Sequence, residues 1–374
     1  MLRWLRKSLR SIGILNRAPA SIGRVLNLNP DDLLMRSNLH TLMEVMGPHS
    51  QPNINALRQL ANSIEPLSLN IKQMGYSLAR QLAAALPPSG PTEARMVGMK
   101  GSISTQAAIE SDWAAHWCAE LKIPVVFHRK VWEYCFVMQC LYEADMLQPG
   151  RRGLGFGCGE EPTPSYFASK GIDVTATDLP PEMAAGTGWV DTGQHMSALD
   201  KVYHGHLCER DLFDRHVSLE YVDMNAIPAT LRGYDFCWSI CALEHLGSIE
   251  KGLAFIENTL ETLRPGGVSV HTTEFNIRDD GPTIDNWSSV AFQRKHMEAI
   301  SERLRAKGHI VTPFDYALGD KPLDKFVDLP PWPHDLPPDM RAWLGEGLHL
   351  KLAFDGVIVT CIGLKVEKGP EPAA

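Results

Sequence analysis

A glycine-rich turn and a later acidic residue are the features of this sequence whose types and spacing best fit ligand chemistry. The turn is Gly155-Phe156-Gly157-Cys158-Gly159-Glu160-Glu161, and Asp178 ends the β-type run 172–177. Glycines let a backbone approach a ligand closely, and a carboxylate at the end of the next strand can accept hydrogen bonds from ribose hydroxyls. Asp178 follows Gly159 at roughly the 20-residue interval that such sites use. These residues predict a nucleotide-type ligand.

A dinucleotide is the first alternative, and the spacing disfavours it. Its fingerprint is G-x-G-x-x-G, and counting from Gly155 or Gly157 puts Glu160 or Pro162 at the third glycine position. Two adjacent carboxylates, Glu160 and Glu161, would also repel a pyrophosphate. They suit a ligand that carries positive charge.

The sequence around the turn predicts an α/β fold that places these residues at strand ends. Stretches 164–170 and 249–263 are typical of helices. Asp223 ends one predicted strand, and the loop 240–246 follows the next, so both are expected at the sheet edge where ligands bind. The predicted strands are 153–156, 172–177, 219–224, 234–239 and 268–273.

In this order the motifs resemble class I (Rossmann-like) methyltransferases that use S-adenosylmethionine, over roughly residues 150–276. The turn 264–267, Arg-Pro-Gly-Gly, is similar to the family's turn before its fifth strand. The resemblance implies a seven-stranded sheet closed by an antiparallel pair from 309–312 and 356–363. It implies that Asp178 holds the ribose and that Asp223 and Met224 meet the adenine. The implied cofactor-binding residues are Gly155, Gly157, Gly159, Glu161, Asp178, Leu179, Asp223, Met224 and Ser239.

Two positions depart from the commonest pattern of that family. Gly155 stands where an acidic residue is frequent, and Glu161 replaces the last glycine of the loop. Glu161 is therefore a candidate for holding the amino group of the cofactor; alternatively, it is a carboxylate favoured by the helix macrodipole. The variant Gly-x-Gly-x-Gly-x-Glu-Pro resembles a bacterial subgroup associated with surface-glycan biosynthesis. That resemblance implies O-methylation of a sugar hydroxyl on a bacterial surface polysaccharide or its precursor. A small-molecule acceptor (a quinone or natural product) and a non-catalytic cofactor-binding scaffold stay open.

Methyl transfer to oxygen needs a base near the acceptor. His245, with Glu244 to orient it, is the candidate, and its alternative is a histidine that only packs on the cofactor rim. The long connection 179–215 and the end of the fifth strand provide polar and aromatic residues for an acceptor. The candidate acceptor residues are Trp189, Gln194, His195, Glu274 and Asn276.

Other chemistry-bearing residues have simpler interpretations. We expect His271 in the core, and we expect the acidic residues of 279–285 to form a solvated loop and not a metal site. Residues 128–130 either close over the cofactor or form an exposed helix start. The stretch 315–350 is typical of an inserted lid on the acceptor side.

Composition limits the class of protein. The formal charge of −8 argues against nucleic acid as a partner, and no apolar run reaches the ~18 residues of a membrane span. The eight cysteines form no Cys-x-x-Cys pair, so we expect no zinc site and buried free thiols. These features indicate a cytoplasmic protein.

The chain is expected to divide into a helical region (1–90), a linker with helices that cap the cofactor site (91–148, with helices near 109–121 and 129–146), and the methyltransferase domain (149–367). Residues 1–30 carry six basic residues and no acidic one, which suits peripheral contact with the inner face of a membrane or a solvated terminus. Apolar residues from Leu57 to Leu78 follow a heptad, which favours homo-oligomerisation through 30–90 or packing on the chain's own domain. Pro66 is expected to break this helix, and 87–91 to be a linker.

Overall fold

The structure is a computed structural model, and it describes residues 54–87, 93–184 and 195–370. The chain forms two compact units, 1–70 and 71–374. The basic segment 1–30, most of the expected linker, and the candidates Trp189 and Gln194 lie outside the described residues.

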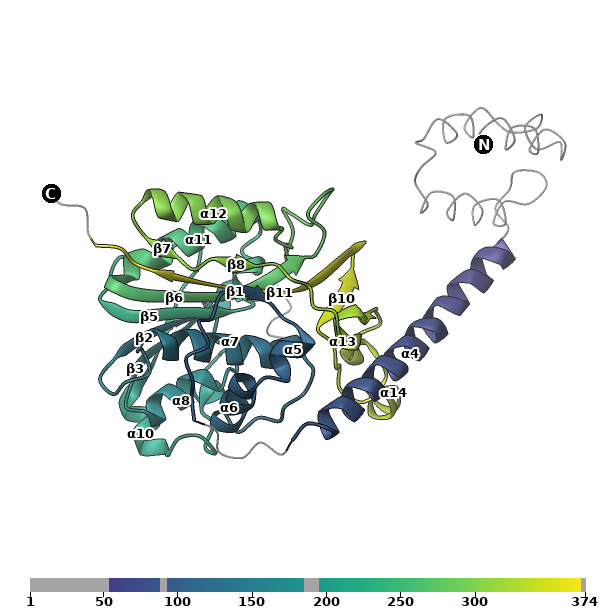
Figure 1. Cartoon of the computed structure of the whole chain (residues 1–374), viewed down its shortest axis with the longest axis horizontal. Coiled ribbons are helices and arrows are strands. Elements are labelled where there is room, and N and C mark those ends of the chain that lie inside the picture. Colours follow the sequence, from purple (N-terminus) through teal and green to yellow (C-terminus); the bar gives the residue numbers. More distant parts are fainter. Residues whose placement is uncertain (1–53, 88–92, 185–194, 371–374) are drawn as a thin grey trace, which may run out of the picture. The chain divides into compact units, whose positions relative to one another are not determined.

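A mixed sheet organises residues 71–374, which confirms the α/β class (Figure 1). Five neighbouring strands are parallel to one another, and β11 runs antiparallel beside β6. β7 pairs antiparallel with β11, so the expected closing pair is confirmed. In spatial order these strands are β4 (Val217–Tyr221), β3 (Asp173–Asp178), β2 (Arg152–Phe156), β5 (Tyr234–Ile240), β6 (Leu263–Asn276), β11 (Val357–Glu367) and β7 (Ile310–Val311).

Four further short strands extend the sheet beyond β11. The strand β1 precedes the expected domain in sequence and pairs antiparallel with β11, so the segment 91–148 contributes a strand as well as helices. β8 pairs with β1, β10 with β11, and β9 with β10. Their bounds are β1 (Gly101–Ile103), β8 (Phe314–Asp315), β9 (Val327–Asp328) and β10 (Lys351–Phe354).

Helices cover both faces of the sheet. In Figure 1, α11 and α12 lie on one face, and α7 and α8 lie on the other. The first turn of α7 is capped by His128, and that of α11 by Ser248, because each side chain accepts a hydrogen bond from a backbone N–H of the helix. The helices of this unit are α5 (Gln106–Ile109), α6 (Asp112–Glu120), α7 (Arg129–Glu143), α8 (Thr163–Ser169), α9 (Pro181–Ala184), α10 (Arg210–His216), α11 (Ile249–Thr259), α12 (Arg294–Ala306), α13 (Pro322–Lys325) and α14 (Pro338–Leu344). Single 3₁₀ turns are η1 (Leu199–Val202), η2 (Leu243–His245), η3 (Leu260–Thr262) and η4 (Pro333–Asp335).

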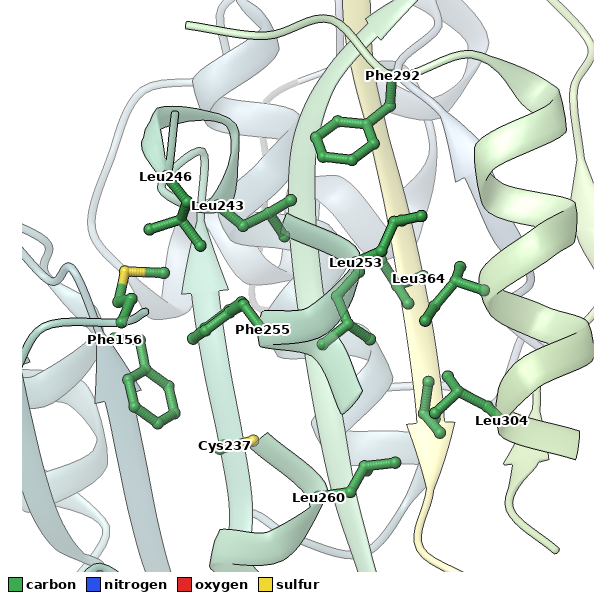
Figure 2. Close-up of a cluster of buried hydrophobic side chains, with 14 of the residues drawn as sticks. Phe156, Cys237, Leu243, Leu246, Leu253, Phe255, Leu260, Phe292, Leu304 and Leu364 are labelled. Carbon is green, nitrogen blue, oxygen red and sulfur yellow. The ribbon is translucent and has the colours of Figure 1, made fainter. Parts of the chain in front are cut away.

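Large apolar side chains are buried in the core between the sheet and α11. Leu253 and Phe255 of α11 are almost fully buried, and Phe255 packs edge-on against Phe156 at the end of β2, with ring centroids 5.2 Å apart (Figure 2). Burial of such side chains contributes about 1.5–3 kcal/mol each. This packing fixes the end of β2, where the glycine-rich turn begins.

The helix α4 (Ile54–Ala84) contradicts the predicted break at Pro66, since it continues through that residue. The proline deletes one backbone hydrogen bond, to the carbonyl of Asn62. Asn62 is exposed, so water can satisfy that carbonyl and the helix persists. Four heptad residues on α4 are exposed: Ile64 (56%), Leu67 (59%), Ile71 (40%) and Met74 (75%).

The C-terminal part of α4 is held to the insertion 315–350 by a buried polar network. Asp328 of β9 pairs with Lys72 at 2.6 Å and accepts hydrogen bonds from the Tyr76 hydroxyl and the His349 ring, each at 2.7 Å. Hydrogen bonds and ion pairs hold the pKa of Asp328 below its usual value, although burial alone would raise it. Burying a carboxylate is tolerable only when it is paired in this way. The insertion is therefore anchored to α4.

None of the helices in the described parts of the chain combines the length and the apolar character that crossing a membrane requires.

Candidate active site

A cavity of about 650 Å³ opens at the carboxyl ends of β2, β3 and β5, where the sequence predicted the ligand site. Its volume is typical of a small-molecule site. No residue of the insertion 315–350 lines it, so within the described residues the expected lid is not part of its wall. The wall includes these predicted site residues: Gly157, Gly159, Glu161, Asp178, Leu179, His195, Asp223, Met224 and His245.

The turn after β2 requires glycine for two different reasons. Gly157 and Gly159 have φ of +62° and +54°, a conformation that other residues adopt at a cost. Gly155 is not among the residues that line the cavity, and its expected contact with the cofactor stays a prediction. A Cβ at Gly155 would lie 2.4 Å from the Cys158 sulfur and 2.5 Å from the Trp238 ring. Gly155 is needed because these side chains pack against the turn.

Asp178 is held in place by backbone donors. Its Oδ2 accepts hydrogen bonds from the N–H groups of Gly159 (3.1 Å) and Met196 (2.9 Å), and its Oδ1 accepts one from Leu179 (2.7 Å). Each carboxylate oxygen has more than one lone pair, so further hydrogen bonds to a ligand are available. The carboxylate thus joins the glycine-rich turn to the end of β3 and is preorganised at the cavity wall.

Glu161 is buried at the N-terminal side of α8, with 6% of its surface exposed. Its Oε2 accepts hydrogen bonds from the Trp238 indole N–H (3.1 Å) and the Thr163 hydroxyl (3.0 Å). Burial raises the pKa of Glu161 to about 8, against the opposing effect of the Lys130 ammonium. At pH 7 the carboxyl group is therefore mostly protonated, and a bound cation would favour its ionised form.

Asp223 and Met224 follow β4 and lie at the cavity together, as expected. The Oδ1 of Asp223 accepts a hydrogen bond from the N–H of Asn225 (2.8 Å). His195, an expected acceptor residue, also lines the cavity, and its Nε2 is 2.7 Å from the Leu179 carbonyl oxygen at the end of β3.

His245 lines the cavity from the 3₁₀ turn after β5. Its Nδ1 lies 3.0 Å from the Ser288 carbonyl oxygen, which can only accept, so Nδ1 carries the proton and donates. Burial lowers the pKa of His245 to about 4, and the ring is therefore neutral at pH 7. A neutral imidazole with its proton on Nδ1 has a lone pair on Nε2, which is the form that a base requires.

The remaining predicted site residues lie behind the wall. Glu244 is fully buried and accepts a hydrogen bond from the Thr273 hydroxyl (3.0 Å), and Glu274 pairs with Arg129 of α7. Glu244 Oε1 is 3.9 Å from His245 Nε2, close enough to influence the ring electrostatically. Neither carboxylate is among the residues that line the cavity, and the acceptor contact expected of Glu274 stays a prediction.

Ser239 and Asn276 also do not line the cavity, and their expected contacts with the cofactor and the acceptor stay predictions. The Ser239 hydroxyl lies 2.7 Å from Nδ1 of His271, which is buried, so the expected core histidine is confirmed. The amide of Asn276 donates to the Thr283 hydroxyl (3.2 Å) and shapes the loop that follows β6. In that loop the Asp285 carboxylate accepts a hydrogen bond from the N–H of Ile249 at the start of α11.

Helix α7 contributes residues that the sequence left ambiguous. Lys130 and Tyr134 line the cavity, so the stretch 128–130 closes over the site in part, while Arg129 turns to Glu274 behind it. Cys241 also lines the cavity and has φ of +49°. In the sequence, Cys241 was indicated only by its position just after the predicted strand 234–239.

Comparison with protein-family models finds no match, and comparison with curated proteins finds none either. Solved structures give distant matches. A putative sarcosine dimethylglycine methyltransferase from Galdieria sulphuraria is 14% identical, with 64% of this chain and 88% of that chain covered and a TM-score of 0.36. The [4+2]-cyclase SpnF is 16% identical, with coverages of 64% and 83% and a TM-score of 0.36. Phosphoethanolamine N-methyltransferase 2 from Haemonchus contortus, in complex with S-adenosylmethionine, is 14% identical, with coverages of 62% and 52% and a TM-score of 0.37. Similarity this distant does not assign an activity to the chain.

Proposed function

We propose that the chain is an S-adenosylmethionine-dependent methyltransferase. The observation that carries the proposal is the gathering of Asp178, Asp223 and Glu161 around one cavity beside the turn that contains Gly157 and Gly159. Asp178 is suited to ribose hydroxyls, and Asp223 to the exocyclic amine of adenine. Glu161 offers a buried carboxylate for a positively charged group. These three demands are met together by S-adenosylmethionine and not by a dinucleotide.

The cofactor supplies an activated methyl group, so the protein has to position an acceptor and remove its proton. His245 provides the lone pair of Nε2 at the cavity wall and can take the proton of an acceptor hydroxyl. The Ser288 carbonyl oxygen fixes the ring through Nδ1, in the way that orienting groups act on catalytic histidines. Glu244 is buried beside the ring, and burial raises the pKa of its carboxyl group to about 8, so the neutral carboxyl group borders the ring at pH 7.

We propose a sugar hydroxyl of a bacterial surface polysaccharide or its precursor as the acceptor. The Gly-x-Gly-x-Gly-x-Glu-Pro turn supports this through its resemblance to a glycan-associated subgroup, and a neutral histidine base suits a hydroxyl acceptor. A small molecule such as a quinone is the second candidate. Turnover of labelled S-adenosylmethionine on purified glycans, sugar precursors and quinones tests both. Cofactor binding without turnover on any of them would favour a scaffold.

The variant Glu161→Gln tests how the amino-acid end of the cofactor is held. It keeps an oxygen for the Trp238 and Thr163 donors but cannot ionise. We expect it to weaken S-adenosylhomocysteine binding about tenfold, since a hydrogen-bonded charge is worth about 1.5–3 kcal/mol. Binding of methylthioadenosine, which lacks the amino-acid end, should be unchanged. Calorimetry with both ligands measures this difference.

The pKa of Glu161 gives the same test a pH dependence. With a pKa of about 8 before the ligand binds, the carboxyl group must lose its proton to pair with the ligand ammonium. Affinity of the wild type for S-adenosylhomocysteine should therefore rise between pH 6 and 7.5, with release of a proton, and the slope should disappear in Glu161→Gln. Equal slopes in both proteins would contradict a role for Glu161 in holding the ammonium.

We also propose that the exposed heptad face of α4 pairs with a second copy of the chain. Met74 is 75% exposed and Ile71 40%, and both belong to a spacing typical of coiled-coil seams. The variant Met74→Glu should convert an oligomer to a monomer in light scattering of the full-length protein. Asn62→Glu, at an exposed position of the same helix that the heptad places opposite the seam, is the control. A monomeric wild type would contradict the proposal.

A further inference from the structure

Three side chains with metal-ligating atoms meet behind the cavity wall. Cys241 follows β5, Glu244 lies in η2, and Glu274 lies near the end of β6. One ligand atom from each lies within 4.8 Å of the others. They converge because β5 and β6 are parallel neighbours, so their carboxyl ends lie side by side. Cys241 also lines the cavity.

Two carboxylate oxygens of this group have no hydrogen-bond partner among the described residues: Glu244 Oε1 and Glu274 Oε2. Both side chains are buried, with residue exposures of 0% and 7%. Their other oxygens are used, by Thr273 and by Arg129 respectively. A buried acceptor without a donor costs about 1–3 kcal/mol. The arrangement is therefore stabilised by whatever brings positive charge to these oxygens.

The charges around Cys241, Glu244 and Glu274 are compatible with a bound divalent cation. Arg129 and Lys130 supply two positive charges. Glu274 and Glu133 balance these two charges, and Glu244 and Cys241, once ionised as metal ligands, would add two negative charges. A divalent ion balances this buried set, in which an unpaired charge would cost several kcal/mol.

We propose that Cys241, Glu244 and Glu274 bind a divalent transition-metal ion. Zn²⁺ suits this set best, because it accepts thiolate and carboxylate ligands together and is commonly held by three protein ligands with one position open. On binding, the ion takes the place of the Cys241 thiol proton and of the Glu244 carboxyl proton, and both protons leave to solvent. The cysteines lack zinc-type spacing, so no metal site was expected from the sequence; the three ligands come from different strand ends.

A second set shares Cys241 and is the poorer alternative. It consists of Glu133, Cys241 and Cys361, again with ligand atoms within 4.8 Å. Both oxygens of Glu133 already accept hydrogen bonds, from the Thr272 hydroxyl (2.7 Å) and the Cys361 thiol (3.1 Å). The unpartnered oxygens thus belong to the first set.

The test is a Co²⁺ titration of the reduced full-length protein after removal of bound metal, with absorption measured in the near ultraviolet, where thiolate-to-cobalt charge transfer occurs. We expect about one equivalent of Co²⁺ to bind and to be displaced by Zn²⁺. Cys241→Ala should remove the charge-transfer band. Glu244→Gln, which preserves the shape of the side chain, should weaken Co²⁺ binding at least ~10-fold, as loss of a charged ligand implies.

Two controls separate this site from other thiols. Cys208→Ala removes a buried thiol outside both sets, and Cys361→Ala removes a ligand of the second set alone; both should keep the band. The proposal is overturned if the wild type shows no band, if Cys241→Ala keeps it, or if Cys361→Ala loses it while Glu244→Gln binds normally. The readout does not require methyl transfer, and calorimetry with S-adenosylhomocysteine on the same variants reports the cofactor site separately.

Discussion

Replacing Asp178 with alanine is expected to weaken binding of S-adenosylmethionine and S-adenosylhomocysteine about 100-fold. Two ribose hydroxyls donating to a carboxylate contribute about 1.5–3 kcal/mol each, and about 1.4 kcal/mol is a factor of ten. The substitution also leaves the backbone N–H groups of Gly159, Leu179 and Met196 without their acceptor, so the turn loses its fixed position. Calorimetry of the full-length protein measures the affinity.

The matched control for this variant is Asp173→Ala. Asp173 begins the strand that Asp178 ends, its side chain is 59% exposed, and it pairs with His216 away from the cavity. Its removal should leave cofactor affinity within about twofold, since exposed ion pairs contribute little. Circular dichroism and thermal unfolding of both variants separate lost binding from lost folding. If a folded Asp178→Ala variant bound S-adenosylhomocysteine as tightly as the control, the proposed contact between Asp178 and the ribose would be contradicted.

Replacing His245 with alanine is expected to lower kcat by about 100-fold or more, the range that general bases contribute. Affinity for S-adenosylhomocysteine should change little, because the ring is assigned to the acceptor proton and not to the cofactor. Steady-state turnover with whichever acceptor proves active, together with calorimetry, gives both quantities. His206→Ala, which removes an exposed histidine outside the cavity wall, is the control.

The pKa of His245 fixes the sign of its pH effect. Burial lowers this pKa to about 4, so the basic form persists as pH falls from 8 to 5. Protonation of His245 should therefore cause no loss of kcat in that interval, and a loss should begin only near pH 4. A wild-type profile whose acidic limb near pH 6.5 disappears in a His245 variant would contradict this neutral-base assignment.

The cofactor side of the site could be predicted from sequence because its signals are local. The turn 155–161 and the run 172–178 each fix a strand end, and parallel strands bring those ends to one edge whatever happens elsewhere. Even there, the packing of side chains against Gly155 was not predicted. A sequence pattern does not distinguish a glycine that faces a ligand from one that a neighbouring side chain excludes, and the Trp238 ring that crowds Gly155 lies on another strand.

The acceptor side could not be predicted because it depends on long-range packing. Glu274 meets Arg129 of α7, and Cys241 meets Cys361 of β11, across most of the domain in sequence. The buried pair of Lys72 and Asp328 likewise ties α4 to an insertion that the sequence suggested as a lid. Pro66 was misjudged for a different reason, since the cost of a helical proline depends on whether its orphaned carbonyl is exposed.

The most direct test of the central claim is a pair of calorimetric titrations of the full-length wild type, one with S-adenosylhomocysteine and one with NAD⁺. The account predicts about one bound S-adenosylhomocysteine per chain in the micromolar range and no binding of NAD⁺, because Glu160 and Glu161 border the turn where a pyrophosphate would lie. Binding of NAD⁺ in preference to S-adenosylhomocysteine, or of neither ligand at millimolar concentration, would contradict it.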